Sequence, residues 1–169
     1  LAILVGFTMN GQWSYNSNWT GVQASTCTAS GDYSTAMGDG TTASGDYSTS
    51  MGRSTAASAL YSTAMGRSTA ASALYSTAMG YGTDASGYFS TAMGSSTTAS
   101  ALYSTAMGDG TIASGSRSTA MGSYTTASDY ASLSIGRYNS VNSTVTAGGS
   151  ATSFDTDNAA FVIGNGTGS

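Results

Sequence analysis

Small and apolar residues recur every 14 positions along most of this chain. The run Ser-Thr-Ala-Met-Gly, or a close variant of it, begins at Ser34 and returns at each 14-residue step up to Ser118. A second marker, Ala-Ser, begins at Ala29 and returns with the same period up to Ala127. Residues 29–140 are therefore eight tandem coils of 14 residues, and such a period indicates a repeat architecture.

The residue pattern within each coil predicts two short β-strands separated by two turns. Ser34-Thr35-Ala36-Met37 alternates small and larger residues, which is typical of a strand. Gly38 and the polar residues that follow it favour a tight turn. We therefore predict an all-β protein, a parallel β-solenoid with strands of about four or five residues. With about 4.8 Å per coil, the rod would be about 38 Å long.

Strand alternation predicts which side chains face the interior. Ser34, Ala36 and Gly38 point one way and Met37 points the other. A roll with two short strands per coil has a lumen wide enough only for small side chains. We therefore place Ser34, Ala36 and Ala43 inside, together with their equivalents in the other coils.

This assignment leaves a row of methionines on an outer face. Soluble monomers rarely expose an apolar stripe of that size, so identical chains packing around an axis are expected to cover it. The alternative, which the pattern leaves open, is that methionine fills the lumen and the small residues lie outside. The predicted oligomer interface consists of Met37, Met51, Met65, Met79, Met93, Met107 and Met121.

The N-terminal residues 1–28 carry no clear repeat and predict a cap or an assembly segment. Their first seven residues are strongly apolar but too few to span a bilayer, which takes about 20. They fit a remnant of a signal-peptide core, a buried strand or an assembly segment. Added as a strand to a neighbouring subunit, they would promote end-to-end polymerisation through open coil edges. The predicted assembly strand comprises Leu1, Ile3, Leu4, Val5 and Phe7.

The C-terminal residues 141–169 predict degenerate terminal coils and a cap. Val141 takes the next alanine position of the repeat. One degenerate coil follows, after which Ile163-Gly164 returns in phase with Met37-Gly38.

Composition argues against catalysis. The chain has no His, Lys, Glu or Pro, and charged residues make up 7% of it, against about 25% in a typical soluble domain. Because His and Lys are the commonest general bases and Schiff-base formers, we predict no enzyme, cofactor or metal. Four Arg residues are too few to favour a nucleic-acid partner. The single Cys27 occupies the phase of Thr41 and is interpreted as a turn substitution.

The repeat resembles the head repeat of trimeric autotransporter adhesins and of related bacterial and phage surface fibres. The resemblance is carried by Ser34–Gly38 followed by Ala43-Ser44-Gly45, and by Ser76–Gly80 followed by Ala85-Ser86-Gly87. It implies a left-handed parallel β-roll, a homotrimer, display outside a bacterial cell or on a virion, and adhesion. Such adhesins continue into a stalk and a membrane anchor, which this chain does not include, so we expect that those parts were removed or that the chain assembles without them.

Three further columns of the repeat carry charged or aromatic side chains. Asp32 and Asp46 share a column and fit either a solvated turn or a shared cation, whereas Asp39 beside Arg53 predicts an exposed ion pair. An aromatic column predicts a stacked ladder, with binding of sugar rings as the alternative. Its members are Tyr33, Tyr47, Tyr61, Tyr75, Phe89 and Tyr103.

Taken together, these patterns predict a structural and adhesive subunit of an extracellular fibre or filament. Its main partner is itself, with a host surface or glycan as a possible second partner and no membrane span. One alternative is a soluble trimeric adhesin head cut from a longer protein. Another is an ice-binding solenoid, because a threonine rank begins at Thr35, but the neighbouring Met37 column argues against a flat ice face. A polysaccharide lyase is disfavoured by the missing His and Lys.

Overall fold

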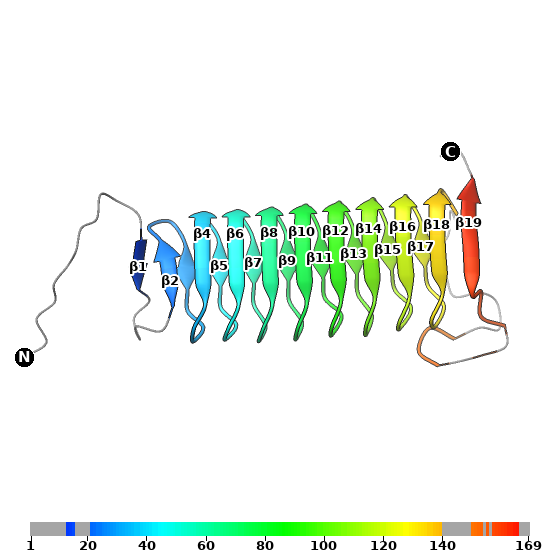
Figure 1. Ribbon diagram of the computed structural model, residues 1–169, viewed down its shortest axis with the longest axis horizontal. Helices are drawn as coiled ribbons and strands as arrows, with labels where there is room; N and C mark the ends of the chain where they lie inside the picture. Colours follow the sequence, from blue (N-terminus) through cyan, green and yellow to red (C-terminus); the bar gives the residue numbers. More distant parts are fainter. Residues whose placement is uncertain (1–12, 16–20, 140–149, 154, 156, 166–169) are drawn as a thin grey trace, which may run out of the picture.

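Each 14-residue coil adds one rung to a parallel β-solenoid in the computed structural model (Figure 1). The structure describes residues 13–15, 21–139, 150–153, 155 and 157–165. The long strands lie side by side along the rod and form one sheet, and the short strands form a second sheet behind it. The predicted all-β solenoid of about eight coils is therefore confirmed, and no helix occurs in these ranges.

The larger sheet has eleven strands within the described residues. Neighbouring strands are parallel except for β1 and β2, which form an antiparallel pair at the N-terminal end. In sheet order the strands are β1 (Trp13–Tyr15), β2 (Val22–Ala24), β4 (Thr35–Asp39), β6 (Thr49–Arg53), β8 (Thr63–Arg67), β10 (Thr77–Tyr81), β12 (Thr91–Ser95), β14 (Thr105–Asp109), β16 (Thr119–Ser123), β18 (Leu133–Arg137) and β19 (Phe161–Asn165).

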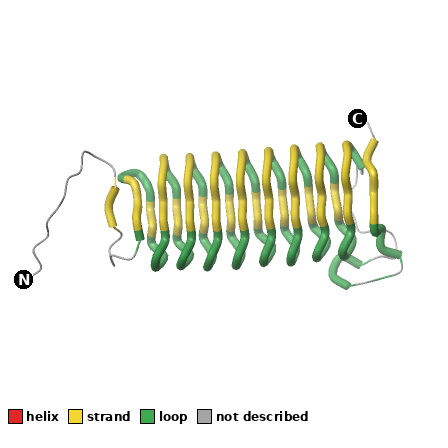
Figure 2. The backbone as a smooth tube through the Cα atoms, viewed as in Figure 1, coloured by secondary structure: helices red, strands yellow, loops and turns green. Residues whose placement is uncertain are grey.

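The smaller sheet has eight strands in the described ranges, and each is only two residues long. The second strand of a coil is thus shorter than predicted, because two turns occupy the rest of the coil (Figure 2). These strands are β3 (Thr28–Ala29), β5 (Thr42–Ala43), β7 (Ala56–Ala57), β9 (Ala70–Ala71), β11 (Asp84–Ala85), β13 (Thr98–Ala99), β15 (Ile112–Ala113) and β17 (Thr126–Ala127).

Equivalent residues of successive coils lie directly beside one another. Met79 pairs with Met93, for example, and the Thr77 N–H donates to the Ser90 carbonyl over 2.9 Å. This register holds from β4 to β18, so each column of the repeat becomes a straight row along the rod. A sequence column can therefore be read as a surface row or an interior row.

The interior contains only small side chains. Ala36 and Ala43 are 0% exposed, Ser34 is 1% exposed, and their equivalents are similarly buried. The predicted inward face is therefore confirmed, and the alternative with methionine in the lumen is wrong. Because alanine buries little apolar area, the packing energy of one roll is small and the regular backbone ladder contributes much of its order.

Gly38 departs from the predicted alternation. It is exposed, and its φ of 129° interrupts the extended backbone that would have turned its Cβ toward the lumen. The glycine is required for a different reason, namely the close approach of the next coil. A Cβ at Gly38 would lie 1.9 Å from the Gly52 carbonyl oxygen, which no side chain can accommodate.

The Thr41 column is interior, which corrects the interpretation of Cys27 as a turn substitution. Thr41 is 1% exposed, and Cys27, in the same phase, is 5% exposed. The Cys27 thiol donates to the Gly38 carbonyl over 3.3 Å. Sequence alternation missed this column because the turn before it breaks the two-residue period.

The C-terminal end also differs from the prediction. β19 pairs directly with β18, so that Ile163 lies beside Ile135 although 28 residues separate them. The phase predicted for Ile163 is confirmed, but no degenerate coil lies between the two strands of the larger sheet. The described residues 150–153 instead lie along one turn edge of the rod, where Ser150 and Ala151 accept backbone hydrogen bonds.

Candidate functional site

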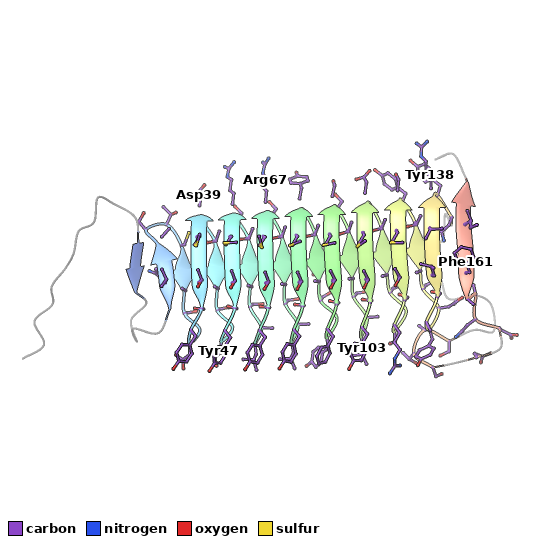
Figure 3. All side chains as sticks on the ribbon, viewed as in Figure 1. Asp39, Tyr47, Arg67, Tyr103, Tyr138 and Phe161 are labelled. Atoms are coloured by element: carbon purple, nitrogen blue, oxygen red, sulfur yellow. The ribbon has the colours of Figure 1, made fainter. Side chains whose placement is uncertain are left out.

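The outer face of the larger sheet carries one methionine per coil from β4 to β16. We call this row, Met37 to Met121 at 14-residue steps, the methionine face. Figure 3 shows its sulfur atoms running along the rod, and each methionine is partly exposed. Ile135 and Ile163 continue the row on β18 and β19, and Ile163 is 66% exposed. The structure thus gathers all seven predicted interface methionines on one uncovered apolar surface.

The aromatic column forms a continuous stack along one turn edge. Ring centroids of successive members from Tyr33 to Tyr103 lie 4.9–5.0 Å apart, with interplanar angles of 7–19°. Figure 3 labels Tyr47 and Tyr103 on this edge. Neighbouring rings cover much of each other's faces, which favours the structural interpretation over stacking on sugar rings.

Arg117 continues the aromatic stack at its C-terminal end. Its guanidinium carbon lies 5.6 Å from the Tyr103 ring centroid and 5.3 Å from that of Tyr130. The Arg117 Nη1 also donates to the Tyr130 hydroxyl over 2.6 Å. A cation between two ring faces is a favourable replacement for an aromatic ring at the end of the column.

The opposite turn edge is polar and charged. Asp39 and Arg53 form the predicted ion pair, with Arg53 Nε 3.5 Å from Asp39 Oδ2 and both side chains well exposed. Arg67 lies over the ring of Tyr81, and Tyr138 stacks on Tyr124 at 5.1 Å between centroids. Figure 3 labels Asp39, Arg67 and Tyr138 on this edge. Because these contacts are exposed, each contributes little to the free energy of unfolding.

The acidic pair of the aromatic edge has a local hydrogen-bonding role. The Asp32 backbone N–H donates to Asp46 Oδ1 over 2.9 Å. This contact explains why one coil places its carboxylate beside the next without requiring a shared cation. Within the described ranges, no three His, Cys, Asp or Glu side chains gather into a group that could hold a metal ion.

Two ionisable groups have shifted pKa values. Partial burial raises the pKa of the Asp84 carboxyl above its usual range, although a hydrogen bond with Ser86 partly opposes this effect. Burial also tends to raise the pKa of the Cys27 thiol, but hydrogen bonds with Thr41 and Thr26 outweigh it and leave the pKa lowered. The two groups lie far apart in the repeat, so they do not form a reaction centre.

Side-chain amides close both ends of the smaller sheet, a feature that the sequence analysis missed. At the N-terminal end, Gln23 Oε1 accepts the Ala29 N–H over 2.9 Å. At the C-terminal end, Asn139 Oδ1 accepts the Thr126 N–H over 2.6 Å and Asn139 Nδ2 donates to the Thr126 carbonyl over 2.8 Å. The sequence did contain a signal for these contacts, because an amide residue interrupts a regular column at each end. Asn139 interrupts the threonine column and Gln23 interrupts the methionine column.

The geometry defines a structural repeat protein, with a small-residue interior, an apolar outer face and no gathered polar cluster in the described residues. Four segments match the model of the YadA head domain repeat, each match spanning two coils: residues 29–55, 57–83, 85–111 and 113–139. The chain therefore belongs to the YadA head domain repeat family, which forms the heads of trimeric autotransporter adhesins. No curated protein matches the chain.

The predicted resemblance is thus confirmed at the level of the family. YadA-type head domains are surface-exposed parts of bacterial adhesins, and the family is structural rather than enzymatic. Among the described residues, none lies in a helix with the length and apolar character needed to cross a membrane. The predicted assembly strand of Leu1, Ile3, Leu4, Val5 and Phe7 lies outside the described residues.

Proposed function

We propose that this chain is a structural and adhesive subunit of an extracellular surface fibre, and that identical chains associate as left-handed homotrimeric rolls through the methionine face. The observation that carries this proposal is the inversion of apolar size in each coil. The largest apolar residue of the strand, Met79 for example, remains partly exposed, whereas Ala78 beside it is 0% exposed.

The free energies involved favour association. Fully burying a methionine side chain stabilises a protein by about 1.5–3 kcal/mol, so covering the smaller part that is still exposed contributes roughly 0.5 kcal/mol per coil. The seven methionines of the row together give about 4 kcal/mol per chain, a large contribution beside the entire stability of an ordinary domain, about 5–15 kcal/mol. A single roll with an interior of Ala, Ser and Thr has no other apolar surface of this size on its strands.

Membership of the adhesin-head family supports surface display and an adhesive role. The exposed turn edges, one aromatic and one charged, are the surfaces that a trimer formed through its sheets would offer to a host surface or glycan. We assign residues 29–140 to the roll and residues 1–28 and 141–169 to terminal or assembly segments.

End-to-end assembly into a filament completes the proposal. The smaller sheet is closed by Gln23 and Asn139, so the larger sheet is the route by which rods would join. Its last strand β19 stands at the end of the strand order, and its open backbone edge is one that a neighbouring rod would extend. The apolar residues 1–7 supply the assembly strand at this joint. The alternative product is a discrete trimeric head.

The role of the methionine face is tested by a double variant in which both Met79 and Met93 are replaced by Asp. We expect the double variant to dissociate to single chains, because four charges per pair of chains cannot be buried in an apolar interface. Light scattering measures the mass. The matched control is Ser58→Asp with Ser72→Asp, which adds the same charge at exposed serines beside the smaller sheet and leaves the trimer intact.

The filament is tested by electron microscopy of the intact chain and of a chain lacking residues 1–7. We expect filaments from the first and discrete trimers from the second. Filaments of unchanged length after the deletion would exclude residues 1–7 as the assembly strand, and discrete trimers from the intact chain would exclude the filament.

A further inference from the structure

The larger sheet ends in two strands, β1 and β19, that each have a strand on only one side within the described residues. They stand at opposite ends of the rod (Figure 1). The smaller sheet differs, because the side-chain amides of Gln23 and Asn139 bond to its end strands. An open strand edge offers backbone donors and acceptors to a further strand. The open edges of β1 and β19 are therefore the places where the backbone of one rod can bond to another.

The open edge of β19 consists of the backbone groups of two residues. The Leu133 N–H donates to the Ala160 carbonyl over 2.9 Å, so Leu133 directs its backbone groups toward β19. In a parallel ladder, alternate residues of a strand bond to opposite sides. Phe161, the partner of Leu133, therefore directs its N–H and C=O away from β18, and Ile163 does the same.

The open edge of β1 is built in the same way. The Val22 N–H donates to the Ser34 carbonyl over 2.9 Å, so Val22 bonds toward β4 and not toward β1. Tyr15 is the partner of Val22 in the antiparallel pair of β1 and β2. Antiparallel partners either exchange both hydrogen bonds or exchange none. Tyr15 therefore directs its N–H and C=O to the open edge, as does Trp13 two residues earlier.

Strand direction fixes how the two edges meet. A rod that follows another along the same axis brings its β1 beside β19 of the first rod. β1 runs antiparallel to β2, whereas β2 to β4 and β18 to β19 are parallel pairs. Figure 1 shows the arrow of β1 pointing opposite to that of β19. The two strands of such a joint are therefore antiparallel.

The rows of the repeat select one register for this joint. Through β2, Tyr15 stands in the row of Thr35, and Phe161 ends that row on β19. If the rows continue across the joint, Tyr15 lies opposite Phe161. Trp13 then lies opposite Ile163. All four residues direct their backbone groups to the open edges, so the register that continues the rows also gives each of these groups a partner.

The outward residues of β19 lack a flanking strand. Phe161 is 55% exposed and Ile163 is 66% exposed. Leu133 and Ile135 stand in the same rows with a strand on each side, and both are less exposed. A strand added beside β19 would flank Phe161 and Ile163 in the same way. Aromatic and β-branched residues are also favourable cross-strand partners.

We propose that β1 of one chain pairs with β19 of a second copy as antiparallel strands, with Tyr15 opposite Phe161 and Trp13 opposite Ile163. The larger sheet then continues without a break from one rod to the next. This inference rests on the proposed end-to-end assembly and names the strand that bonds to β19. Residues 1–7 precede β1 and are a separate part of the joint. Contact between unlike ends can repeat indefinitely, whereas pairing of two β19 edges would stop at two rods.

A disulfide tests the register and the copy together. Ser14 and Val162 lie opposite each other in the proposed joint, as a pair without hydrogen bonds whose Cα atoms are about 4.5 Å apart, within the range of a disulfide. Two single-cysteine chains, Ser14→Cys and Val162→Cys, each also carrying Cys27→Thr, are mixed, assembled and oxidised with diamide. We expect disulfide-linked dimers that join position 14 to position 162. Because the two cysteines belong to different chains, this link can form only between copies.

Each single-cysteine chain oxidised alone is the matched control and should stay unlinked. A dimer of Val162→Cys chains would show that two β19 edges pair with each other, which overturns the inference. Filaments in the electron microscope without the link between positions 14 and 162 would also overturn it.

Proline at the β19 edge tests the backbone bonds themselves. Ile163→Pro removes an N–H that only the joint uses, whereas Val162→Pro removes one that bonds to β18. Relative to Ile163→Ala, we expect Ile163→Pro to weaken end-to-end association by about tenfold or more with little change in melting temperature. Val162→Pro should lower the melting temperature. Equal end-to-end association of Ile163→Pro and Ile163→Ala would contradict the inference.

The outcomes separate this inference from the proposed function. Discrete trimers of the intact chain would exclude the filament and the inference with it. Filaments that lack the disulfide link would overturn the inference alone. Filaments that survive deletion of residues 1–7 and still form the link would exclude residues 1–7 as the assembly strand and support β1 as the strand that bonds to β19.

Discussion

Ser50 Oγ and Thr55 Oγ1 lie 2.7 Å apart across the interior of the roll and form its one hydroxyl pair among the described residues. Most other coils have Ala at the position of Ser50, and in several of them the facing threonine hydroxyl is buried without a partner. These unpaired hydroxyls include Thr69, Thr83, Thr97 and Thr111. The column thus offers a direct comparison between a satisfied and an unsatisfied interior hydroxyl.

Removing the Ser50 hydroxyl should destabilise the roll. Ser50→Ala leaves Thr55 Oγ1 buried and unpaired, which costs about 1–3 kcal/mol in the free energy of unfolding. Conversely, Ala92→Ser should give Thr97 a partner and raise the melting temperature. Chemical denaturation of the assembled chain measures both changes, with the exposed Ser44→Ala as the control. A stable Ser50→Ala together with a destabilised Ala92→Ser would show that packing, not hydrogen bonding, decides this row.

The aromatic column holds its residues in a strained backbone conformation. Tyr61 has φ 57°, in the left-handed region that bulky residues rarely adopt. Tyr61→Ala loses the stacking and keeps the strain, whereas Tyr61→Gly loses the stacking and relieves the strain. We therefore expect the melting temperature to be highest with Tyr, lower with Gly and lowest with Ala. The free energy of unfolding of the Gly variant should exceed that of the Ala variant by about 1–2 kcal/mol. An alanine variant as stable as the glycine variant would contradict this account of the turn.

The glycine after each methionine sets the approach of neighbouring coils. A Cβ at Gly66 would lie 2.1 Å from the Gly80 carbonyl oxygen, whereas nothing lies within 4 Å of a Cβ at Gly40. Gly66→Ala should therefore break the ladder and prevent folding of the roll. Gly40→Ala, at φ 61°, should cost only about 1 kcal/mol. Circular dichroism and melting of the two variants measure the difference, and similar stability in both would refute the close-approach argument.

Asp84 should make the stability of its coil depend on pH. Because partial burial raises its pKa in the folded state, the protonated form is favoured on folding. The resulting stabilisation is fully present below the unfolded pKa of about 3.9 and is lost as pH rises through the folded pKa. Asp84→Asn should therefore raise the melting temperature at pH 7, and the gain should shrink toward pH 3. A gain that is independent of pH would show that titration of Asp84 is not its cause.

The repeat and its inward face could be predicted because period and residue size are both properties of the sequence. The lumen admits only small side chains. Because Ala36 is small and Met37 is large, Ala36 is expected to face the lumen and Met37 to face outward. The interior position of Thr41 could not be predicted in this way. Two turn residues precede it, and the direction of a side chain after a turn depends on backbone angles that the pattern does not encode.

The ends were harder to predict than the repeat for a related reason. Gln23 shares the phase of the methionine column, but β2 is offset by one residue, so that Gln23 pairs with Ala36. Asn139 closes the smaller sheet through a contact that only the finished roll creates. A periodic sequence specifies its interior rows, whereas the residues that end the period act through individual contacts.

The mass of the folded chain in solution tests the central claim most directly. Light scattering across a range of concentrations, on material whose circular dichroism shows intact β-structure, should give three chains or a multiple of three, with the methionine face covered. A folded single chain that stays monomeric at high concentration would contradict the account, because its seven outer methionines would then be exposed without a partner.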